Sequence, residues 1–365
     1  MISGFQSVAN KKNLKECGLL RVDVNGIPVV LAMVEGKVYT MDAVCSHEGG
    51  PLEEGTIEGY CLTCPWHQAI FDVRNAKVSP QTNWATDLHS YAVNVDEGTG
   101  NISVSLQSKS GEAAVERKTA PEQQPIATLG LTKKEKLVGT DIMTFRFAKK
   151  EYPDYKPGQF AFFPLDNVKD AKGPVRHFSL ASSPTEDELV ISTRIRDTPY
   201  KQALSLLAPG AQVEISKPQG NFTLHEDHDK PAVLLSGGIG VTPFRSMIKY
   251  ATDKQMRTRI VMFDSNRNEQ NILYKNEFDR WARENKNLKV VYTITDDEPD
   301  KGDWPGERGR IDKEMVTRHL TSQDRSAAMF YICGPPGMLE AMQKLLRTEL
   351  QIPQERVKVE EFTGY

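Results

Sequence analysis

Two short pairs of cysteine and histidine constrain this chain more than any other feature. Cys45-Ser46-His47 is followed, sixteen residues later, by Cys64-Pro65-Trp66-His67. Glycine and proline shape both segments, because Gly49-Gly50-Pro51 follows the first pair and Pro65 lies inside the second. Tight loops of this kind hold a metal centre from two sides. The pattern predicts that Cys45, His47, Cys64 and His67 are metal ligands.

The spacing of these residues distinguishes between two metals. Two cysteines and two histidines also suit zinc, but zinc ribbons and fingers favour a cysteine pair and a histidine pair, each closely spaced. Here each pair mixes one cysteine with one histidine. A [2Fe–2S] centre with cysteines on one iron and histidines on the other has this mixed ligand set. The spacing therefore favours an iron–sulfur cluster over zinc.

Composition excludes several other classes of protein. The chain has 365 residues, enough for two or three domains, and a formal net charge of −3, which makes nucleic acid an unexpected partner. No apolar run approaches the ~20 residues of a membrane span, and the first residues lack the basic and apolar regions of a signal peptide. Five scattered cysteines argue against a disulfide framework. These features predict a cytoplasmic protein that does not bind membranes.

The hydrophobic pattern predicts a multidomain protein with both β and α/β domains. Residues 1–106 read as short strands between turns, which predicts a small antiparallel β domain. Residues 107–126 carry few large apolar side chains and are predicted to be a linker. Residues 127–229 are again strand-rich, as in a β-barrel, and residues 230–365 alternate apolar strands with helical stretches, as in a parallel sheet.

The N-terminal module resembles a Rieske-type ferredoxin of the kind that feeds bacterial oxygenases. The resemblance implies that Cys45 and Cys64 bind one iron, and His47 and His67 the other. Respiratory Rieske proteins carry an extra disulfide and two hydroxyls near the cluster, whereas the matching positions here hold Trp66, Ala69 and Phe71. Fewer hydrogen bonds to sulfur stabilise the reduced cluster less. We therefore expect a potential at the low end of the Rieske span of roughly −150 to +300 mV.

A second constellation lies on a predicted barrel strand, Arg176-His177-Phe178-Ser179. An arginine binds phosphate bidentately, an aromatic ring packs on a flat isoalloxazine, and a serine hydroxyl hydrogen-bonds a ring nitrogen. The strand is followed by Arg194 and Lys201.

Two loops follow apolar strands in the C-terminal part. Ser236-Gly-Gly-Ile-Gly-Val-Thr-Pro243 opens a helix, where glycines let the backbone approach a pyrophosphate. Cys333-Gly-Pro-Pro-Gly-Met338 follows the last apolar strand. Asp264 lies about 20 residues after the glycine loop, where an acid binds a free ribose hydroxyl, and nearby Arg267 suits a 2′-phosphate. The nucleotide-binding residues predicted from the glycine loop and its surroundings are Gly237, Gly238, Gly240, Thr242, Pro243, Asp264 and Arg267.

Residues 127–365 resemble the ferredoxin–NADP⁺ reductase superfamily along their whole length. The resemblance implies that Arg176, Phe178 and Ser179 contact the flavin, with Phe178 where the family usually has tyrosine. It also implies that Arg194 and Lys201 belong to the segment that closes around the flavin phosphates. Because a lysine there neutralises a pyrophosphate, FAD is favoured over FMN. The loop of Cys333, Gly334 and Pro335 would bind the nucleotide, with Cys333 beside the nicotinamide. Phe362 would stack near the flavin, and one of the two adjacent glutamates, here assigned as Glu361, would polarise the site. Ser179, Cys333 and Glu361 are thus the candidate catalytic residues.

The order of these parts predicts an NAD(P)H:acceptor oxidoreductase, with NADH slightly favoured over NADPH. Electrons would pass from NAD(P)H to FAD, to the Rieske [2Fe–2S] cluster and then to a terminal oxygenase or similar redox protein. One alternative is a stand-alone flavin reductase that acts on a small-molecule acceptor. Another is a non-enzymatic redox sensor, although no DNA-binding motif or basic patch supports it.

Overall fold

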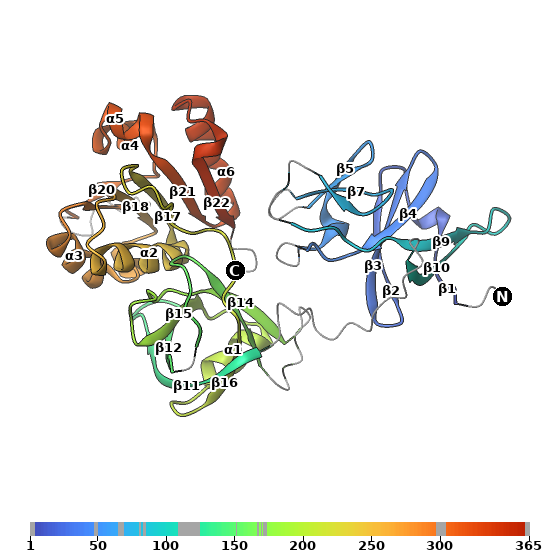
Figure 1. Cartoon of the computed structure of the whole chain (residues 1–365), viewed down its shortest axis with the longest axis horizontal. Coiled ribbons are helices and arrows are strands. Elements are labelled where there is room, and N and C mark those ends of the chain that lie inside the picture. The colour runs from blue at the N-terminus through green and yellow to red at the C-terminus, as the bar shows by residue number, and fades with distance from the viewer. Residues whose placement is uncertain are drawn as a thin grey trace. The chain divides into compact units, whose positions relative to one another are not determined.

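A computed structural model of the chain describes residues 4–46, 50–64, 69–79, 82, 85–108, 125–150, 152–165, 168, 170, 174–296 and 304–361, the side chains of 107, 108 and 361 excepted. The chain divides into two compact units, Met1–Arg117 and Lys118–Tyr365. Figure 1 shows the first in blue and the second from green to red. Within the described ranges, no helix has the length and apolar character that crossing a bilayer requires.

The first unit is built from three small antiparallel sheets, as the alternating pattern predicts. Their strand orders are β1-β10-β9, β2-β3-β4 and β5-β6-β7-β8. Asn25 and Gly26 both have positive φ, as do Glu35 and Gly36, which is the geometry of two-residue hairpin turns. The strands are β1 (Gln6–Asn10), β2 (Leu19–Val24), β3 (Ile27–Val34), β4 (Lys37–Asp42), β5 (Thr56–Glu58), β6 (Cys61–Thr63), β7 (Ile70–Asp72), β8 (Lys77–Val78), β9 (Tyr91–Val95) and β10 (Asn101–Ser108).

The second unit begins with a β-barrel. Four strands pair in the order β15-β12-β11-β16, and β13 pairs with β14. A backbone amide of β13, that of Phe162, donates to the Ser216 hydroxyl of β16 and joins the two groups of strands. The elements are β11 (Pro125–Lys136), β12 (Ile142–Ala148), β13 (Phe160–Pro164), β14 (Val175–Ser179), β15 (Glu188–Arg194), α1 (Pro199–Leu206) and β16 (Gln212–Ser216). Strands β10 and β11 extend into the segment predicted as a linker, and its residues 109–124 lie outside the described ranges.

A six-stranded parallel sheet follows, in the order β20-β19-β18-β17-β21-β22. Helices α2 and α3 pack against one face, and α4 and α6 against the other. The elements are β17 (Ala232–Gly237), α2 (Val241–Asp253), β18 (Ile260–Asn266), α3 (Lys275–Glu284), β19 (Leu288–Ile294), β20 (Glu307–Arg308), α4 (Lys313–His319), α5 (Ser322–Ala327), β21 (Met329–Gly334), α6 (Pro336–Lys344) and β22 (Val357–Glu361). The strand order reverses between β17 and β21, and ligands of open α/β sheets bind beyond the carboxyl ends at such a point.

Barrel and sheet share part of one hydrophobic core. Ile142 of β12 and Phe222, which follows β16, belong to the same buried cluster as Phe244 and Met247 of α2. A methyl group at Gly158, in the turn before β13, would lie 2.2 Å from the Phe222 carbonyl oxygen and 2.5 Å from Met247 Cε. The two parts therefore meet with almost no free space at this turn.

Candidate cofactor sites

Cys45 and Cys64 occupy equivalent places in two loops of the first unit. The Cys45 N–H donates to the Gly50 carbonyl at 2.9 Å, and the Cys64 N–H donates to the Ala69 carbonyl at 2.8 Å. Each cysteine thus lies at the base of a loop that closes five residues later. Both side chains are nearly buried, at 4% and 1% exposure, in one hydrophobic cluster.

This geometry fits a metal centre held between two matched loops. The predicted ligands His47 and His67 fall inside the two loops but lie outside the described residues. Two thiols at the bases of the loops and two imidazoles within them supply the donor set of the mixed [2Fe–2S] centre. Ala69 and Phe71 are fully buried in the same cluster as the cysteines, and neither has a hydroxyl. The low potential expected from them stays a prediction.

Asp42 supports the first loop and was not identified from the sequence. This buried carboxylate accepts hydrogen bonds from the Tyr91 hydroxyl at 2.6 Å and from the His89 backbone N–H at 3.0 Å, and its Oδ2 lies 3.0 Å from His89 Nδ1. Strand β4, which ends at Asp42, is thereby tied to β9 three residues before Cys45. These residues are far apart in the sequence, and no local sequence pattern predicted the contact.

Strand β14 places the residues of the second constellation on two opposite faces. Phe178 points into the barrel, where its ring centroid lies 5.4 Å from that of Phe163 and 6.3 Å from that of Tyr200. Because side chains alternate along a strand, His177 and Ser179 lie on the other face. The His177 ring packs 5.2 Å from Phe160, and burial, aided by Lys201 and Arg176, lowers its pKa to about 4.

Phe178 packs within the barrel core, where its side chain is 6% exposed. Its expected contact with the flavin stays a prediction. Ser179 is also buried, at 4% exposure, and lies opposite Phe160 in the ladder. His177, which sequence reasoning passed over, is the ring that shares a face with Ser179.

A cluster of cations fits the phosphate end of a flavin nucleotide. Lys201 is 7% exposed, donates from Nζ to the Thr193 hydroxyl and lies 4.7 Å from the centre of the Phe178 ring. Burial, together with the nearby charges of Arg176 and Arg196, lowers its pKa to about 7. Arg176 itself pairs with Asp170 at 2.6 Å. A bound pyrophosphate would relieve this repulsion, so the residues fit the group.

Arg194 does not join that cluster. Its guanidinium pairs with Asp141 at 2.5 Å and lies 3.7 Å from where a methyl group at Gly238 would be. The side chain reaches towards the glycine loop of the parallel sheet, and its expected role at the flavin phosphates stays a prediction.

The two glycine-containing loops of the parallel sheet pack directly against each other. Gly238 has φ +56°, and a methyl group at Gly240 would lie 2.3 Å from the carbonyl oxygen of Cys333. A methyl group at Gly237 would lie 2.2 Å from Met338 Sδ. The Thr242 hydroxyl donates to the Ile239 carbonyl at 3.1 Å, and Pro243 lies in the first turn of α2. The close approach leaves backbone N–H groups at a helix start, which suits a pyrophosphate.

Cys333 and a glutamate meet at the end of β21 beside this loop pair. Cys333 is fully buried, and its Sγ lies 4.0 Å from Glu360 Oε2. The two residues are register partners in β21 and β22, so strand alternation would have singled out Glu360. The expected residue was Glu361, whose side chain is not described, and Phe362 lies outside the described residues. Gly334 ends β21 and Pro335 precedes α6.

Asp264 is completely buried, which argues against the expected contact with a ribose hydroxyl. Its Oδ2 accepts from Asn266 Nδ2 at 2.9 Å, and burial raises its pKa to about 7. Three buried oxygens of this group, Asp264 Oδ1, Asn266 Oδ1 and Ser236 Oγ, have no hydrogen-bond partner among the described residues. Arg267, by contrast, is exposed and its Nε lies 3.3 Å from Asp296 Oδ1.

Comparisons with known proteins agree with both halves of this picture. Residues 4–91 match the Rieske [2Fe-2S] domain family, and residues 234–344 match the oxidoreductase NAD-binding domain family. The first range holds all four predicted cluster ligands, and the second holds both glycine-containing loops. The chain therefore contains a Rieske domain and an NAD-binding domain.

Two curated proteins are similar to part of this chain. The Bacillus subtilis (strain 168) flavohemoprotein is 28% identical over 214 residues, 58% of this chain and 53% of that protein. One component of the Na(+)-translocating NADH-quinone reductase of Idiomarina loihiensis is 30% identical over 223 residues, 56% and 53% of the two chains. The chain thus spans about half the length of these relatives.

The fold also recurs in a solved ferredoxin reductase. That structure, the ferredoxin reductase in carbazole 1,9a-dioxygenase, has a TM-score of 0.53 at 19% identity and covers 64% of this chain and 68% of its own. At this level of identity the likeness concerns the fold alone.

Proposed function

We propose that this chain, which joins a Rieske [2Fe–2S] domain to an oxidoreductase NAD-binding domain, is an NAD(P)H-dependent electron-transfer reductase. The observation that carries the proposal is the presence of both on one polypeptide, with a reductase-type β-barrel between them. When bound, a flavin and a Rieske cluster together convert a two-electron hydride donor into a source of single electrons. The acceptor that we propose is a terminal oxygenase or a similar redox protein.

The residues of the second unit have distinct roles in this proposal. Lys201 and Arg176 bind the flavin phosphates, and two phosphate charges in one place favour FAD over FMN. The Ser179 hydroxyl orients the flavin ring. The backbone of Gly238–Gly240 holds the nucleotide pyrophosphate at the start of α2, while Cys333 and Glu360 form the floor of the nicotinamide site.

An anaerobic titration of the full chain tests the relay. The purified protein is assayed for iron, acid-labile sulfide and extracted flavin, and is then reduced stepwise with NADH or, separately, NADPH. We expect the flavin absorbance to bleach and the electron paramagnetic resonance signal of a reduced Rieske cluster to appear with the same donor. If the flavin is reduced while the cluster stays oxidised, the relay is refuted and a stand-alone flavin reductase is favoured.

A pair of variants separates the two ends of the relay. His67→Ala removes a predicted cluster ligand, so we expect normal flavin reduction by the nucleotide, no cluster signal and loss of turnover with protein acceptors. His228→Ala changes an exposed histidine of the other unit and should match the wild type. Turnover with an oxygenase encoded by a neighbouring gene, measured with both variants, then tests the proposed acceptor.

A further inference from the structure

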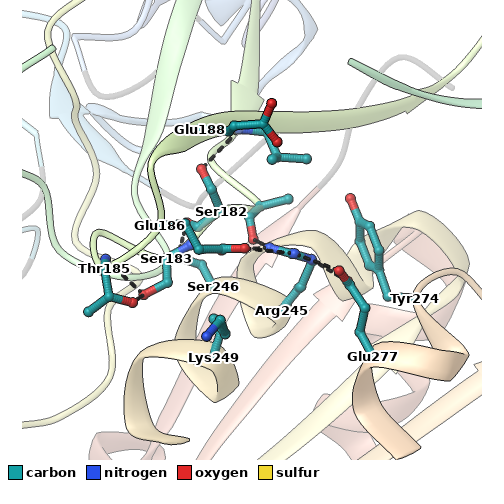
Figure 2. Close-up of polar contacts among 12 residues, drawn as sticks. Ser182, Ser183, Thr185, Glu186, Glu188, Arg245, Ser246, Lys249, Tyr274 and Glu277 are labelled. Atoms are coloured by element: carbon teal, nitrogen blue, oxygen red, sulfur yellow. Dashed lines mark hydrogen bonds and ion pairs between the residues drawn. The ribbon is translucent and has the colours of Figure 1, made fainter. Parts of the chain in front are cut away.

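We propose that Arg245 is a positioning residue that fixes the flavin-binding strand of the barrel relative to the glycine loop of the nucleotide-binding sheet. The inference rests on the proposed function, because it concerns the distance between the two cofactors of that reaction. Figure 2 shows the side chain between a barrel loop and two helices of the sheet. Arg245 lies in α2, five residues after Gly240.

All five N–H groups of the Arg245 guanidinium are used. Nε and Nη2 donate to the two carboxylate oxygens of Glu277 in α3, at 2.7 and 2.9 Å. Nη1 and Nη2 donate to the two oxygens of Glu186 in the loop between β14 and β15, at 2.9 and 3.0 Å. The remaining Nη1–H donates to the Ala181 carbonyl at 2.8 Å. The side chain is therefore held in one orientation by two bidentate pairs and a backbone contact.

The surroundings make this arrangement specific to arginine. Arg245 is 1% exposed, and its guanidinium lies 4.9 Å from the ring centre of Tyr274 and 5.3 Å from that of Trp281. Burial alone would lower its pKa, but the hydrogen bonds to Glu277 and Glu186 outweigh it and raise the pKa. A lysine has three donors on a single nitrogen and cannot reproduce two bidentate pairs.

The contacts connect the two cofactor sites by short paths. Ala181 lies two residues after Ser179, the last residue of β14, so a contact with its carbonyl helps to fix the end of that strand. Beside Arg245, the Ser246 hydroxyl donates to the Ser182 carbonyl at 2.6 Å. One turn of α2 therefore contacts the end of the flavin-binding strand and the loop that follows it. The same helix begins directly after the glycine loop.

A second set of contacts also joins the barrel to the sheet, although the Tyr274 ring in it packs against the Arg245 guanidinium. The Tyr274 hydroxyl lies 2.5 Å from the Ser192 hydroxyl of β15, which lies 2.6 Å from the Thr144 hydroxyl of β12. The shared hydrophobic cluster around Phe244 adds to this contact. Loss of Arg245 should therefore loosen the register between the two sites rather than separate the barrel from the sheet.

The test compares Arg245→Gln, Arg245→Lys and the control Arg280→Gln in the full, cofactor-loaded chain. Arg280 lies in α3 with 56% of its side chain exposed, so its replacement makes the same chemical change without a buried network. Hydrogen exchange of the backbone is measured first, since it does not depend on turnover. We expect faster exchange in residues 181–186 and in α2 for both Arg245 variants, and wild-type exchange for Arg280→Gln.

Rapid-mixing measurements of flavin reduction then separate binding from the step itself. We expect the limiting rate to fall about tenfold or more in Arg245→Gln, because small misplacement of reacting groups has effects of this size. The flavin content of the protein and the nucleotide concentration that gives half the limiting rate should each change by less than about twofold. Arg245→Lys should recover only a minor part of the rate.

The outcomes distinguish this inference from the proposed function. Wild-type exchange in Arg245→Gln, a limiting rate close to that of the wild type, or full rescue by lysine would overturn the positioning role. If the wild type itself is not reduced by NADH or NADPH, the proposed function fails, while the exchange data still decide whether Arg245 fixes this contact. If Arg245→Gln does not fold, Glu186→Gln breaks the barrel side alone and should give the same localised exchange.

Discussion

Replacing Gly240 by alanine would force apart the two loops that form the proposed nicotinamide site. The added methyl group would lie 2.3 Å from the Cys333 carbonyl oxygen, 2.6 Å from its carbonyl carbon and 2.8 Å from Gly334 Cα. All three are backbone atoms and cannot rotate away. Since carbon and carbonyl oxygen come no closer than about 3.3 Å in favourable contacts, the loops must separate by roughly 1 Å.

The effect on stability and on rate can be estimated from this displacement. Overpacking of a tight contact costs about 1–3 kcal/mol of unfolding free energy. A misplacement near 1 Å at a reacting centre lowers a rate by about a hundredfold. We therefore expect Gly240→Ala to fold, with a lower unfolding midpoint, weaker binding of NAD⁺ by calorimetry and much slower reduction of the flavin.

Gly337→Ala is the matched control in the neighbouring loop. A methyl group there meets no atom within 4 Å, and the residue lies in the first turn of α6. Alanine stabilises a helical position relative to glycine by roughly 0.5–1 kcal/mol, so this variant should be neutral or slightly more stable. If Gly240→Ala binds NAD⁺ and unfolds like Gly337→Ala, the proposed role of the loop contact is refuted.

Three further predictions concern titration and redox behaviour. The pKa of Asp264 is raised from 3.8 to about 7 by burial, so the folded state binds the extra proton between these values and stability should fall as pH rises through the window. Asp264→Asn should remove this slope, of the order of 4 kcal/mol in total, in urea unfolding measured across pH. The pKa of Lys201 is lowered from 10.5 to about 7 by burial and by Arg176, and a bound phosphate favours its charged form. Flavin affinity should therefore fall as pH rises through about 7, and Lys201→Met should bind flavin weakly with no such pH dependence in fluorescence titrations. The cluster potential, measured by voltammetry, should lie in the lower half of the Rieske span, and a value above about +100 mV would contradict the expected lack of hydroxyls near sulfur.

The sequence predicted well those features that depend on local chemistry. Asn25-Gly26 marks a hairpin turn by itself, and the glycine loop after β17 needs only a strand before it and a helix after it. The parallel sheet followed from apolar strands that alternate with helical segments. Each of these signals is contained within a few residues of the chain.

Other features arise only when distant segments meet. The saturated environment of Arg245 requires Glu186 and Glu277, which are 59 and 32 residues away, to converge on one guanidinium. The face on which Phe178 lies depends on the packing of the barrel, and a motif read along the chain shows only the order of side chains. The distance of Asp264 from the glycine loop along the chain predicted a contact with a ribose hydroxyl. In β18, however, its side chain is completely buried.

Both cysteine loops are closed by the same kind of main-chain hydrogen bond, and this affects which residues of the loops can change during evolution. The hydrogen bonds run from the Cys45 N–H to the Gly50 carbonyl and from the Cys64 N–H to the Ala69 carbonyl, and they hold the backbone of each cysteine. Because these bonds join backbone atoms, a change of side chain at Gly50 or Ala69 does not remove the acceptor that holds either cysteine. A lineage, or a designer, can therefore change side chains at these two positions while the main-chain bonds of Cys45 and Cys64 are kept.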